Sequence, residues 1–281
     1  MKQILLINDV VGYSHVGMVA MLPILTYLGH PTYNLPTALV SNTLDYGSFE
    51  TLETTDYMRG TIPVWKKLGF KFDAVRTGLM FSEEQARLIA NYCKQLHSDG
   101  TTVFVDPIMG DSGRLYNGIT QRQVELMREM VGVADLTFPN YTEACYLTGS
   151  QYQPDGTTWD EACRILDSIV ALGAKSVIIT SARIDGHSCV VGRRSDTPLA
   201  GFNQLIGDGR YFRLDYEEIP VAFHGTGDIF SAILIGHLMK GEPLKESTRT
   251  AMDIVARLID RNRALPDKCR GIPIEQCLDL L

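Results

Sequence analysis

A glycine-rich turn that opens into an apolar helix carries the clearest chemical signal in the chain. It reads Phe-His-Gly-Thr-Gly-Asp-Ile-Phe over residues 223–230. Glycine leaves no Cβ in the way of a ligand, and the first amides of a helix have no intrahelical acceptors. Because the helix dipole adds positive charge at that end, Gly225, Thr226 and Gly227 form the pattern of an anion-binding site.

Asp228 is the unusual member of this stretch, because a carboxylate repels a phosphate held at the same turn. One explanation is chemical: Asp228 is a base that takes a proton from a hydroxyl group attacking that phosphate. The structural alternative is an acidic residue that stabilises its own helix by about 0.3–1 kcal/mol. The stretch alone leaves both interpretations open.

The elements that must position this turn alternate along the chain. Buried or extended strands are predicted at residues 2–7, 33–40, 73–80, 101–105, 136–138 and 176–180. Helices are predicted at residues 16–28, 50–68, 82–97, 121–131, 141–147, 159–172, 229–239 and 244–262. Between 187 and 216 the pattern changes to strands and turns, with a hairpin tip at Asp208-Gly209. This alternation predicts an α/β fold with a mostly parallel central sheet and helices on both faces.

Four polar residues follow or end these predicted strands, namely Asp9, Asp106, Asn140 and Thr180. Right-handed crossovers bring the carboxyl ends of parallel strands to one edge of the sheet, where ligands bind in open α/β sheets. We therefore expect these four residues to line one edge and to face the glycine turn.

Two motifs on this edge could hold a metal ion. Asp106 and Asp111 lie five residues apart across a proline turn, and Glu143 follows Asn140 by three positions. Phosphoryl transfer needs Mg²⁺ held by few carboxylates together with phosphate oxygens. The structural alternatives are an Asx-Pro turn at Asp106 and a first-turn helix acid at Glu143. Other nucleotide motifs are absent from the sequence, because neither a P-loop nor a dinucleotide-binding glycine fingerprint occurs.

Composition narrows the class of protein. The chain has 281 residues, which allows one large domain or two small ones, and a single α/β domain can reach this size. A hydrophobic content of 45% and a charged content of 21% are ordinary for a globular protein. A net charge of −7 without a Lys/Arg run argues against a nucleic-acid surface. The amino-terminal apolar run is too short for a signal peptide, and no stretch is apolar enough for a membrane span. Six scattered cysteines without a C-x-x-C pair indicate free thiols and a cytoplasmic protein.

At this point the chain resembles the pyridoxal and pyridoxamine kinases of the ribokinase-like superfamily. The resemblance rests on Gly225-Thr226-Gly227-Asp228, on residues 106–111 and on Asn140 with Glu143. It extends over nearly the whole chain through Tyr13, Gly17, Thr37, Ser41-Asn42, Tyr46-Gly47 and Gly78. The resemblance implies one ribokinase-like domain over residues 1–281, a three-layer sandwich. It also implies ATP and Mg²⁺, with K⁺ as a further ion, a homodimer, and a role in vitamin B6 salvage.

The resemblance also implies roles for single residues. Asp228 would be the base acting on the 5′-hydroxymethyl group of the vitamer, while the amides from Gly225 to Gly227 stabilise the transferring phosphoryl group. The residues expected to hold the ATP phosphates and Mg²⁺, directly or through water, are Asp106, Asp111, Asn140 and Glu143, with the three carboxylates as metal ligands. The residues expected near the nucleotide are Thr180, Ser181, Arg213 and Phe223. The residues expected to face the vitamer are Asp9, Thr37, Tyr46 and Leu79.

Three positions depart from the family pattern, and they leave alternatives open. The family usually has serine where Asp9 stands, often histidine at Thr43, and an aromatic tyrosine near Leu79. Hydroxymethylpyrimidine kinases resemble this chain but usually carry cysteine where Asp228 stands. Sugar and nucleoside kinases often have an aspartate at the end of the first strand. A nucleotide-binding regulator without catalysis is the alternative from a different class, and an intact Asp228 counts against it.

Overall fold

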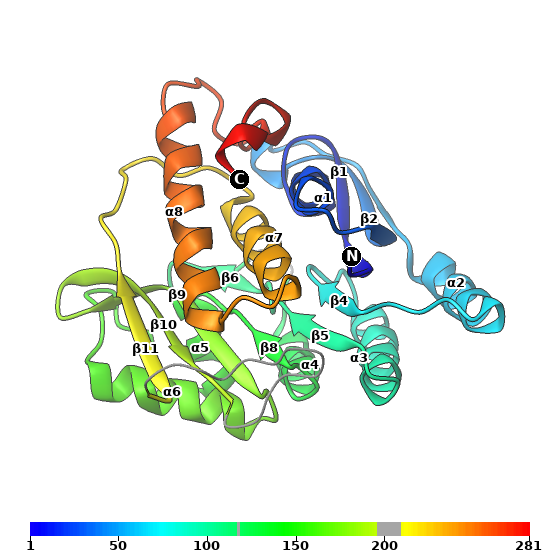
Figure 1. Ribbon diagram of the computed structural model, residues 1–281, viewed down its shortest axis with the longest axis horizontal. Coiled ribbons are helices and arrows are strands. Elements are labelled where there is room, and N and C mark those ends of the chain that lie inside the picture. Colours follow the sequence, from blue (N-terminus) through cyan, green and yellow to red (C-terminus); the bar gives the residue numbers. More distant parts are fainter. Residues whose placement is uncertain (117–118, 196–208) are drawn as a thin grey trace. The chain divides into compact units, whose positions relative to one another are not determined.

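The computed structural model describes residues 1–116, 119–195 and 209–281 (Figure 1). The chain divides into two compact units. Unit 1 comprises Met1–Ala74 and Ile219–Leu281, and unit 2 comprises Val75–Glu218. The single domain over residues 1–281 stays a prediction.

Unit 1 contains three neighbouring strands and four helices. Strand β1 (Ile4–Tyr13) pairs in parallel with β2 (Thr32–Asn42), and β2 pairs antiparallel with β3 (Thr51–Glu53). The helices are α1 (Gly17–Tyr27), α2 (Thr55–Leu68), α7 (Thr226–Met239) and α8 (Leu244–Asn262). Three short 3₁₀ turns complete it, at Leu44–Tyr46, Ile274–Gln276 and Leu278–Leu280.

The core of unit 1 lies around α1, which packs against both β1 and α7. The first four residues of β1, Ile4 to Ile7, have no exposed surface, as expected for a strand buried on both faces. Helix α7 packs against α1 and α8 (Figure 1), and ten of its fourteen residues are buried. The catalytic candidates of this unit are therefore held by well-packed elements.

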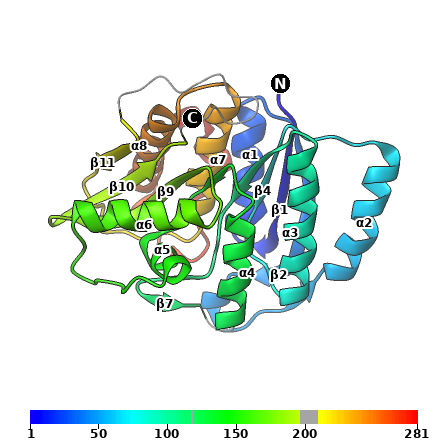
Figure 2. The same cartoon turned by 90° about the horizontal axis from the view of Figure 1, so that it is seen from below.

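Unit 2 contains the strands of the central sheet that do not belong to unit 1. Its strands lie in the order β4, β5, β8, β9, β10, β11, and β5, β8 and β9 are parallel neighbours. Helices α3 and α4 pack against each other, and α6 packs on β9 and β10 (Figure 2). The strands are β4 (Ala74–Thr77), β5 (Thr102–Val105), β6 (Gly110–Asp111), β7 (Arg114–Leu115), β8 (Leu136–Thr137), β9 (Ser176–Ile184), β10 (His187–Arg193) and β11 (Tyr211–Asp215). The helices are α3 (Glu83–Ser98), α4 (Gln121–Val131), α5 (Tyr141–Thr148) and α6 (Trp159–Ala171).

Local signals located most helix ends correctly. The Ser82 hydroxyl accepts a hydrogen bond from the amide of Gln85 at 3.2 Å, so the predicted start of α3 is confirmed. Helix α4 has the predicted bounds, and α5 ends at Gly149 in the left-handed conformation with a φ of 75°. The predicted hairpin tip at Asp208 lies outside the described residues.

One predicted helix begins five residues too early. Residues 51–53 form strand β3, and α2 begins only at Thr55. The reason is tertiary pairing: Leu52 lies opposite Leu39 of β2, and the amide of Thr54 donates to the Thr37 carbonyl at 3.2 Å. These contacts outweigh the helical spacing of the apolar residues in the sequence.

The expected fold class is confirmed, because the chain is α/β with a mostly parallel central sheet flanked by helices. The described residues form no helix that is both long enough and apolar enough to cross a membrane.

Candidate active site

The glycine turn needs one of its glycines for its own structure and leaves the other unexplained. Gly225 has a φ of 79°, and a Cβ there would lie 2.8 Å from the carbonyl oxygen of His15. At Gly227 a Cβ would meet no atom of the described residues within 4 Å. Because neither backbone strain nor packing within the described part of the chain requires glycine at 227, the open space beside it is suited to a ligand.

Helix α7 presents its first amides at this open space. Its first intrahelical hydrogen bond runs from the amide of Ile229 to the carbonyl of Gly225, at 3.0 Å. The amides of residues 226–228 precede that bond, and the Thr226 hydroxyl closes the turn by donating to the Phe223 carbonyl at 3.3 Å. Together with the helix dipole, this arrangement is suited to binding a phosphate group.

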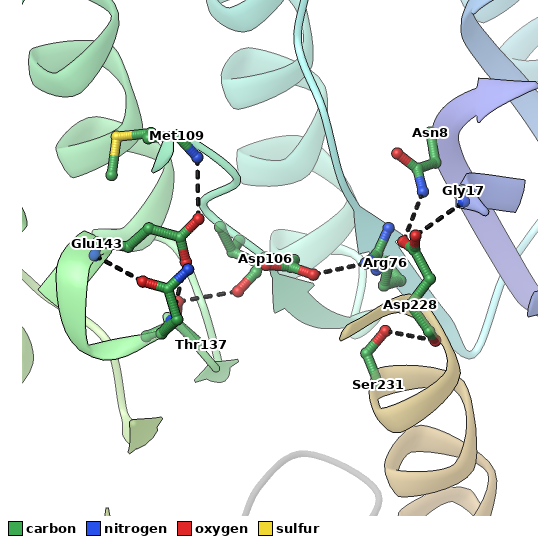
Figure 3. Close-up of polar contacts among 11 residues, drawn as sticks. Asn8, Gly17, Arg76, Asp106, Met109, Thr137, Glu143, Asp228 and Ser231 are labelled. Carbon is green, nitrogen blue, oxygen red and sulfur yellow. Dashed lines mark hydrogen bonds and ion pairs between the residues drawn. The ribbon is translucent and has the colours of Figure 1, made fainter. Parts of the chain in front are cut away.

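Asp228 is held by groups from distant parts of unit 1 (Figure 3). Its Oδ1 accepts a hydrogen bond from Asn8 Nδ2 at 3.2 Å, and its Oδ2 accepts one from the amide of Gly17 at 2.8 Å. A first-turn acid that only stabilises its own helix has no need of partners 220 and 211 residues away. The carboxylate is therefore held in a fixed orientation beside the open turn.

Strand β1 carries Asn8, which binds this carboxylate, and its sequence neighbour Asp9. The expectation that Asp9 follows the first strand is wrong, because β1 continues to Tyr13. A bulge between Asn8 and Val10 interrupts the pairing with β2, which then resumes. Asn8 is opposite Pro36 and Val10 is opposite Leu39, so the extra residue of this bulge lies in β2 and not in β1. A Cβ on Gly17 would lie 2.9 Å from Asp9 Oδ1.

In unit 2, Asp106 forms a buried ion pair. It follows β5 directly, as predicted, and its Oδ2 accepts a hydrogen bond from Arg76 Nη2 at 2.6 Å (Figure 3). Arg76 belongs to β4 and has no exposed surface. A buried guanidinium needs a charged partner, so the pair holds the Asp106 carboxylate in place.

Asn140 and Glu143 form a capping box at the start of α5. Asn140 Oδ1 accepts from the amide of Glu143 at 2.9 Å, and Glu143 Oε2 accepts from the amide of Asn140 at 2.8 Å. Glu143 Oε1 also accepts from the amide of Met109 at 2.9 Å, and Asn140 Nδ2 donates to the carbonyl of Gly110 at 2.8 Å (Figure 3). The capping box therefore ties α5 to the loop that follows Asp106.

Burial is the main influence on the charge of Glu143. It raises the pKa of the carboxyl group well above its ordinary value, and the neighbouring Asp106 charge adds to the rise. Hydrogen bonds from the amides of Met109, Asn140 and Gly110 act in the opposite direction. Both Glu143 oxygens are thus engaged by backbone amides, which makes this residue a support for the loop.

The predicted metal ligands do not make a closed cage. Asp111 is exposed in β6, and its Oδ1 accepts from the amide of Ser112 at 2.6 Å. Across residues 1–116, 119–195 and 209–281, no three His, Cys, Asp or Glu side chains are grouped so that they could hold a metal ion. Mg²⁺ keeps several waters and binds through one or two carboxylates plus phosphate oxygens, so an open set of carboxylates is compatible with this ion.

Three residues of unit 2 were predicted near the nucleotide, namely Thr180, Ser181 and Arg213. Thr180 was predicted to end its strand, but β9 continues to Ile184 because it pairs with β10 beyond that point. Thr180 forms a bridge with Asn140, and Ser181 has a left-handed φ of 55°. The guanidinium of Arg213 pairs with Asp215 at 2.6 Å and also contacts Asp185, the turn residue after β9.

The vitamer candidates are distributed over both units. Thr37 is buried in β2, and the Tyr46 hydroxyl donates to Asp267, a hydrogen bond that raises the pKa of Tyr46 to about 12. Phe223, which was predicted near the nucleotide, belongs to unit 1; it is buried, and the ammonium group of Lys268 lies 4.8 Å from the centre of its ring. Leu79 belongs to unit 2, two residues after β4.

Comparison with known proteins identifies the family. The model of the phosphomethylpyrimidine kinase family matches residues 28–271. The chain belongs to this family. It is 31% identical to the hydroxymethylpyrimidine/phosphomethylpyrimidine kinase of Haemophilus influenzae, over 69% of this chain and 67% of that protein. It is 29% identical to the pyridoxine/pyridoxal/pyridoxamine kinase of Bordetella avium, over 87% of this chain and 80% of that protein.

A solved structure supports the same grouping. A protein from Bacteroides thetaiotaomicron, provisionally described as a phosphomethylpyrimidine kinase, was crystallised with pyridoxal. Its structure aligns with a TM-score of 0.89 at 30% identity, over 99% of this chain and 95% of that one. The predicted membership in the pyridoxal kinase family and the enzyme class of kinase are confirmed.

Sequence reasoning missed two residues of this kinase that hold candidate carboxylates. Asn8 binds Asp228, and Arg76 binds Asp106. An asparagine beside Asp9 was a visible signal, since it is a polar residue in an otherwise apolar run. An arginine inside the predicted strand 73–80 was a second signal, because a buried charge needs a partner.

Alanine at the two glycines of the turn should give opposite results in this kinase. We expect Gly227→Ala to keep or raise the free energy of unfolding, by up to about 1 kcal/mol, because alanine favours helix. Its turnover should fall by at least about tenfold, because the methyl group fills the space for the phosphate.

Gly225→Ala should instead destabilise the fold by more than about 1 kcal/mol, owing to its left-handed backbone. Urea titration and steady-state kinetics measure both; a fully active Gly227→Ala variant would show that the open space is not used.

Glutamine at position 143 should weaken the loop that carries Asp111. The amide group has one acceptor oxygen, so either Met109 or Asn140 loses the partner of its buried N–H. We expect Glu143→Gln to lower the free energy of unfolding by about 1–3 kcal/mol and to raise the Mg²⁺ concentration for half-maximal activity. Urea titration and a magnesium titration of activity are the measurements. An unchanged magnesium midpoint would contradict a role of Glu143 in supporting the metal site.

Proposed function

We propose that this kinase transfers the γ-phosphoryl group of ATP to the 5′-hydroxymethyl group of a B6 vitamer. The observation that carries the proposal is the Asp228 carboxylate, which is oriented by Asn8 and Gly17 beside the open amides of residues 226–228. The relatives that are named for pyridoxine, pyridoxal and pyridoxamine, and the related structure with pyridoxal, support the choice of vitamer.

The proposed chemistry follows from the positions of these groups. Asp228 accepts the proton of the hydroxymethyl group while that oxygen attacks the γ-phosphorus. The bond from the γ-phosphorus to the oxygen that bridges it to the β-phosphate breaks, and ADP leaves. The amides at the start of α7 donate hydrogen bonds to the phosphoryl oxygens, whose negative charge they stabilise.

Mg²⁺ would supply charge neutralisation at the β- and γ-phosphate oxygens. We propose Asp106 and Asp111 as its carboxylate ligands, directly or through water, and Glu143 as the residue that holds their loop. Asn140 would act near the phosphates through the same loop. K⁺ is a further ion to test, and Thr180, Ser181, Arg213 and Phe223 remain proposed nucleotide contacts.

Hydroxymethylpyrimidine is the alternative substrate, because the family model and the Haemophilus influenzae relative carry that name. The carboxylate at 228, where cysteine is typical of such kinases, favours the vitamer. Steady-state assays with ATP and pyridoxal, pyridoxamine, pyridoxine or hydroxymethylpyrimidine test the proposal. A kcat/KM for the pyrimidine that is higher than for every vitamer would overturn it in favour of the alternative.

We also propose that the enzyme is a homodimer that works in the cytoplasm. The side chains of Leu39 and Leu52 pair across β2 and β3, yet they are 45% and 62% exposed. Such an apolar pair at the edge of the sheet, where β3 is the last strand, is suited to burial against a second copy. Six free thiols are suited to a reducing compartment. Sedimentation should give twice the mass of one chain, and a Leu39→Lys/Leu52→Lys variant should give the mass of one; a wild type of monomer mass would contradict the dimer.

A further inference from the structure

A second carboxylate lies beside the proposed base. Asp9 is only 9% exposed, and it contacts the same residue, Gly17, whose amide binds Asp228. A Cβ on Gly17 would lie 2.9 Å from Asp9 Oδ1, while the Gly17 nitrogen lies 2.8 Å from Asp228 Oδ2. With standard backbone dimensions, the two carboxylate oxygens are therefore no more than about 8 Å apart.

A register shift between β1 and β2 lies beside this pair. Asn8 is opposite Pro36 and Val10 is opposite Leu39, so two residues of β2, Thr37 and Ala38, stand opposite Asp9. Asn8 binds the Asp228 carboxylate, and Asp9 contacts Gly17. Gly17 has a φ of 60° and no room for a Cβ, so the approach of Asp9 depends on glycine at this position.

The geometry fits a substrate with two neighbouring polar substituents. In the B6 vitamers the group next to the 5′-hydroxymethyl group is an ammonium in pyridoxamine, an aldehyde in pyridoxal and a hydroxyl in pyridoxine. Charge-assisted hydrogen bonds span about 2.7–2.9 Å, so one small ring can reach two carboxylates that are at most about 8 Å apart. With its hydroxyl at Asp228, such a ring is small enough to place the neighbouring substituent at Asp9.

We infer that Asp9 is a specificity-determining residue that selects a vitamer with a cationic group beside its hydroxymethyl group, namely pyridoxamine. The inference rests on the proposed function. An alkylammonium group is charged at neutral pH, and a buried carboxylate binds a cation much more strongly than a neutral aldehyde or hydroxyl. The preference for pyridoxamine over pyridoxal should be about ten- to a hundredfold in kcat/KM.

Asp9 also has a structural alternative, because a carboxylate near the first residues of α1 stabilises that helix through its dipole. The first turn of α1 contains no acidic residue of its own. A purely structural role would lower activity on all vitamers equally and would lower the melting temperature. A specificity role changes the ratio between vitamers, which is the readout that separates the two roles.

The experiment compares wild type, Asp9→Asn and Asp9→Ser on pyridoxamine, pyridoxal and pyridoxine, with Asp253→Asn as a control. Asp253 is an exposed carboxylate on α8 in the same unit. Asp9→Asn keeps the shape and removes the charge. We expect kcat/KM for pyridoxamine to fall about ten- to a hundredfold in both Asp9 variants, and kcat/KM for the other two vitamers to change less than about threefold. The control variant should match wild type on all three.

Calorimetric binding of pyridoxamine without ATP gives an independent readout, and its affinity should fall by the same factor in the Asp9 variants. Equal use of the three vitamers by wild type, or a ratio that Asp9→Asn leaves unchanged, would overturn this inference and leave the proposed function intact. A wild type that phosphorylates no vitamer would overturn both.

Discussion

Replacing Asp228 with asparagine should lower kcat by about 10²–10⁴-fold, because a general base contributes about that much to proton transfer. Asparagine keeps the shape of the side chain and can still accept one of the two hydrogen bonds from Asn8 and Gly17. We therefore expect ATP binding within about threefold of wild type and a folded protein. Steady-state kinetics and calorimetric binding of ATP are the measurements.

The matched control for this variant is Glu246→Gln. Glu246 is the acidic residue in the first turn of α8, so it interacts with a helix dipole as Asp228 does, without a candidate reaction beside it. Its replacement should cost at most about 1 kcal/mol of stability and leave kcat unchanged. If Asp228→Asn and Glu246→Gln gave the same kcat, Asp228 would be a structural acid like its control.

Replacing Arg76 with methionine should lower the free energy of unfolding by about 3–5 kcal/mol, because Asp106 would lose the buried partner of its charge. The pair is nearly dry: the Arg76 side chain has no exposed surface, and the Asp106 side chain is 12% exposed. The double variant Arg76→Met/Asp106→Asn should recover part of the loss, since the uncompensated carboxylate is then gone. Urea titrations of the three proteins measure these differences.

An exposed pair serves as the comparison. Arg261 binds Asp279 through two hydrogen bonds of 2.6 and 2.8 Å, with the side chains 40% and 64% exposed. Arg261→Met should cost no more than about 1 kcal/mol, as is usual for ion pairs at the surface. Equal losses for Arg76→Met and Arg261→Met would show that burial of the Arg76 pair adds nothing.

The elements that the sequence predicted well are those with local signals. Ser82 with Gln85 at the start of α3, and Asn140 with Glu143 at the start of α5, are capping patterns that act within one helical turn. Strand β3 and the extension of β1 to Tyr13 were missed, because they depend on pairing with β2 rather than on their own residues.

The same difference between local signals and long-range contacts applies to the candidate site. The turn from Gly225 to Asp228 could be found from residue types and spacing, because an anion-binding helix start is a local feature. The partners of its carboxylate could not, since Asn8 and Gly17 lie more than two hundred residues earlier. Glu143 has contacts that its residue type did not reveal: the carboxylate predicted at the metal also binds the amides of Met109 and Asn140 with its two oxygens.

The most direct test of the account is the product of a single turnover. Purified enzyme would be mixed with ATP, Mg²⁺ and each B6 vitamer, and the phosphorylated product would be examined by ³¹P NMR and mass spectrometry. We predict a phosphate monoester on the 5′-hydroxymethyl oxygen in wild type, and none on the same time scale with Asp228→Asn. Hydrolysis of ATP without a phosphorylated vitamer, or a 5′-phosphate formed equally fast by Asp228→Asn, would contradict the account.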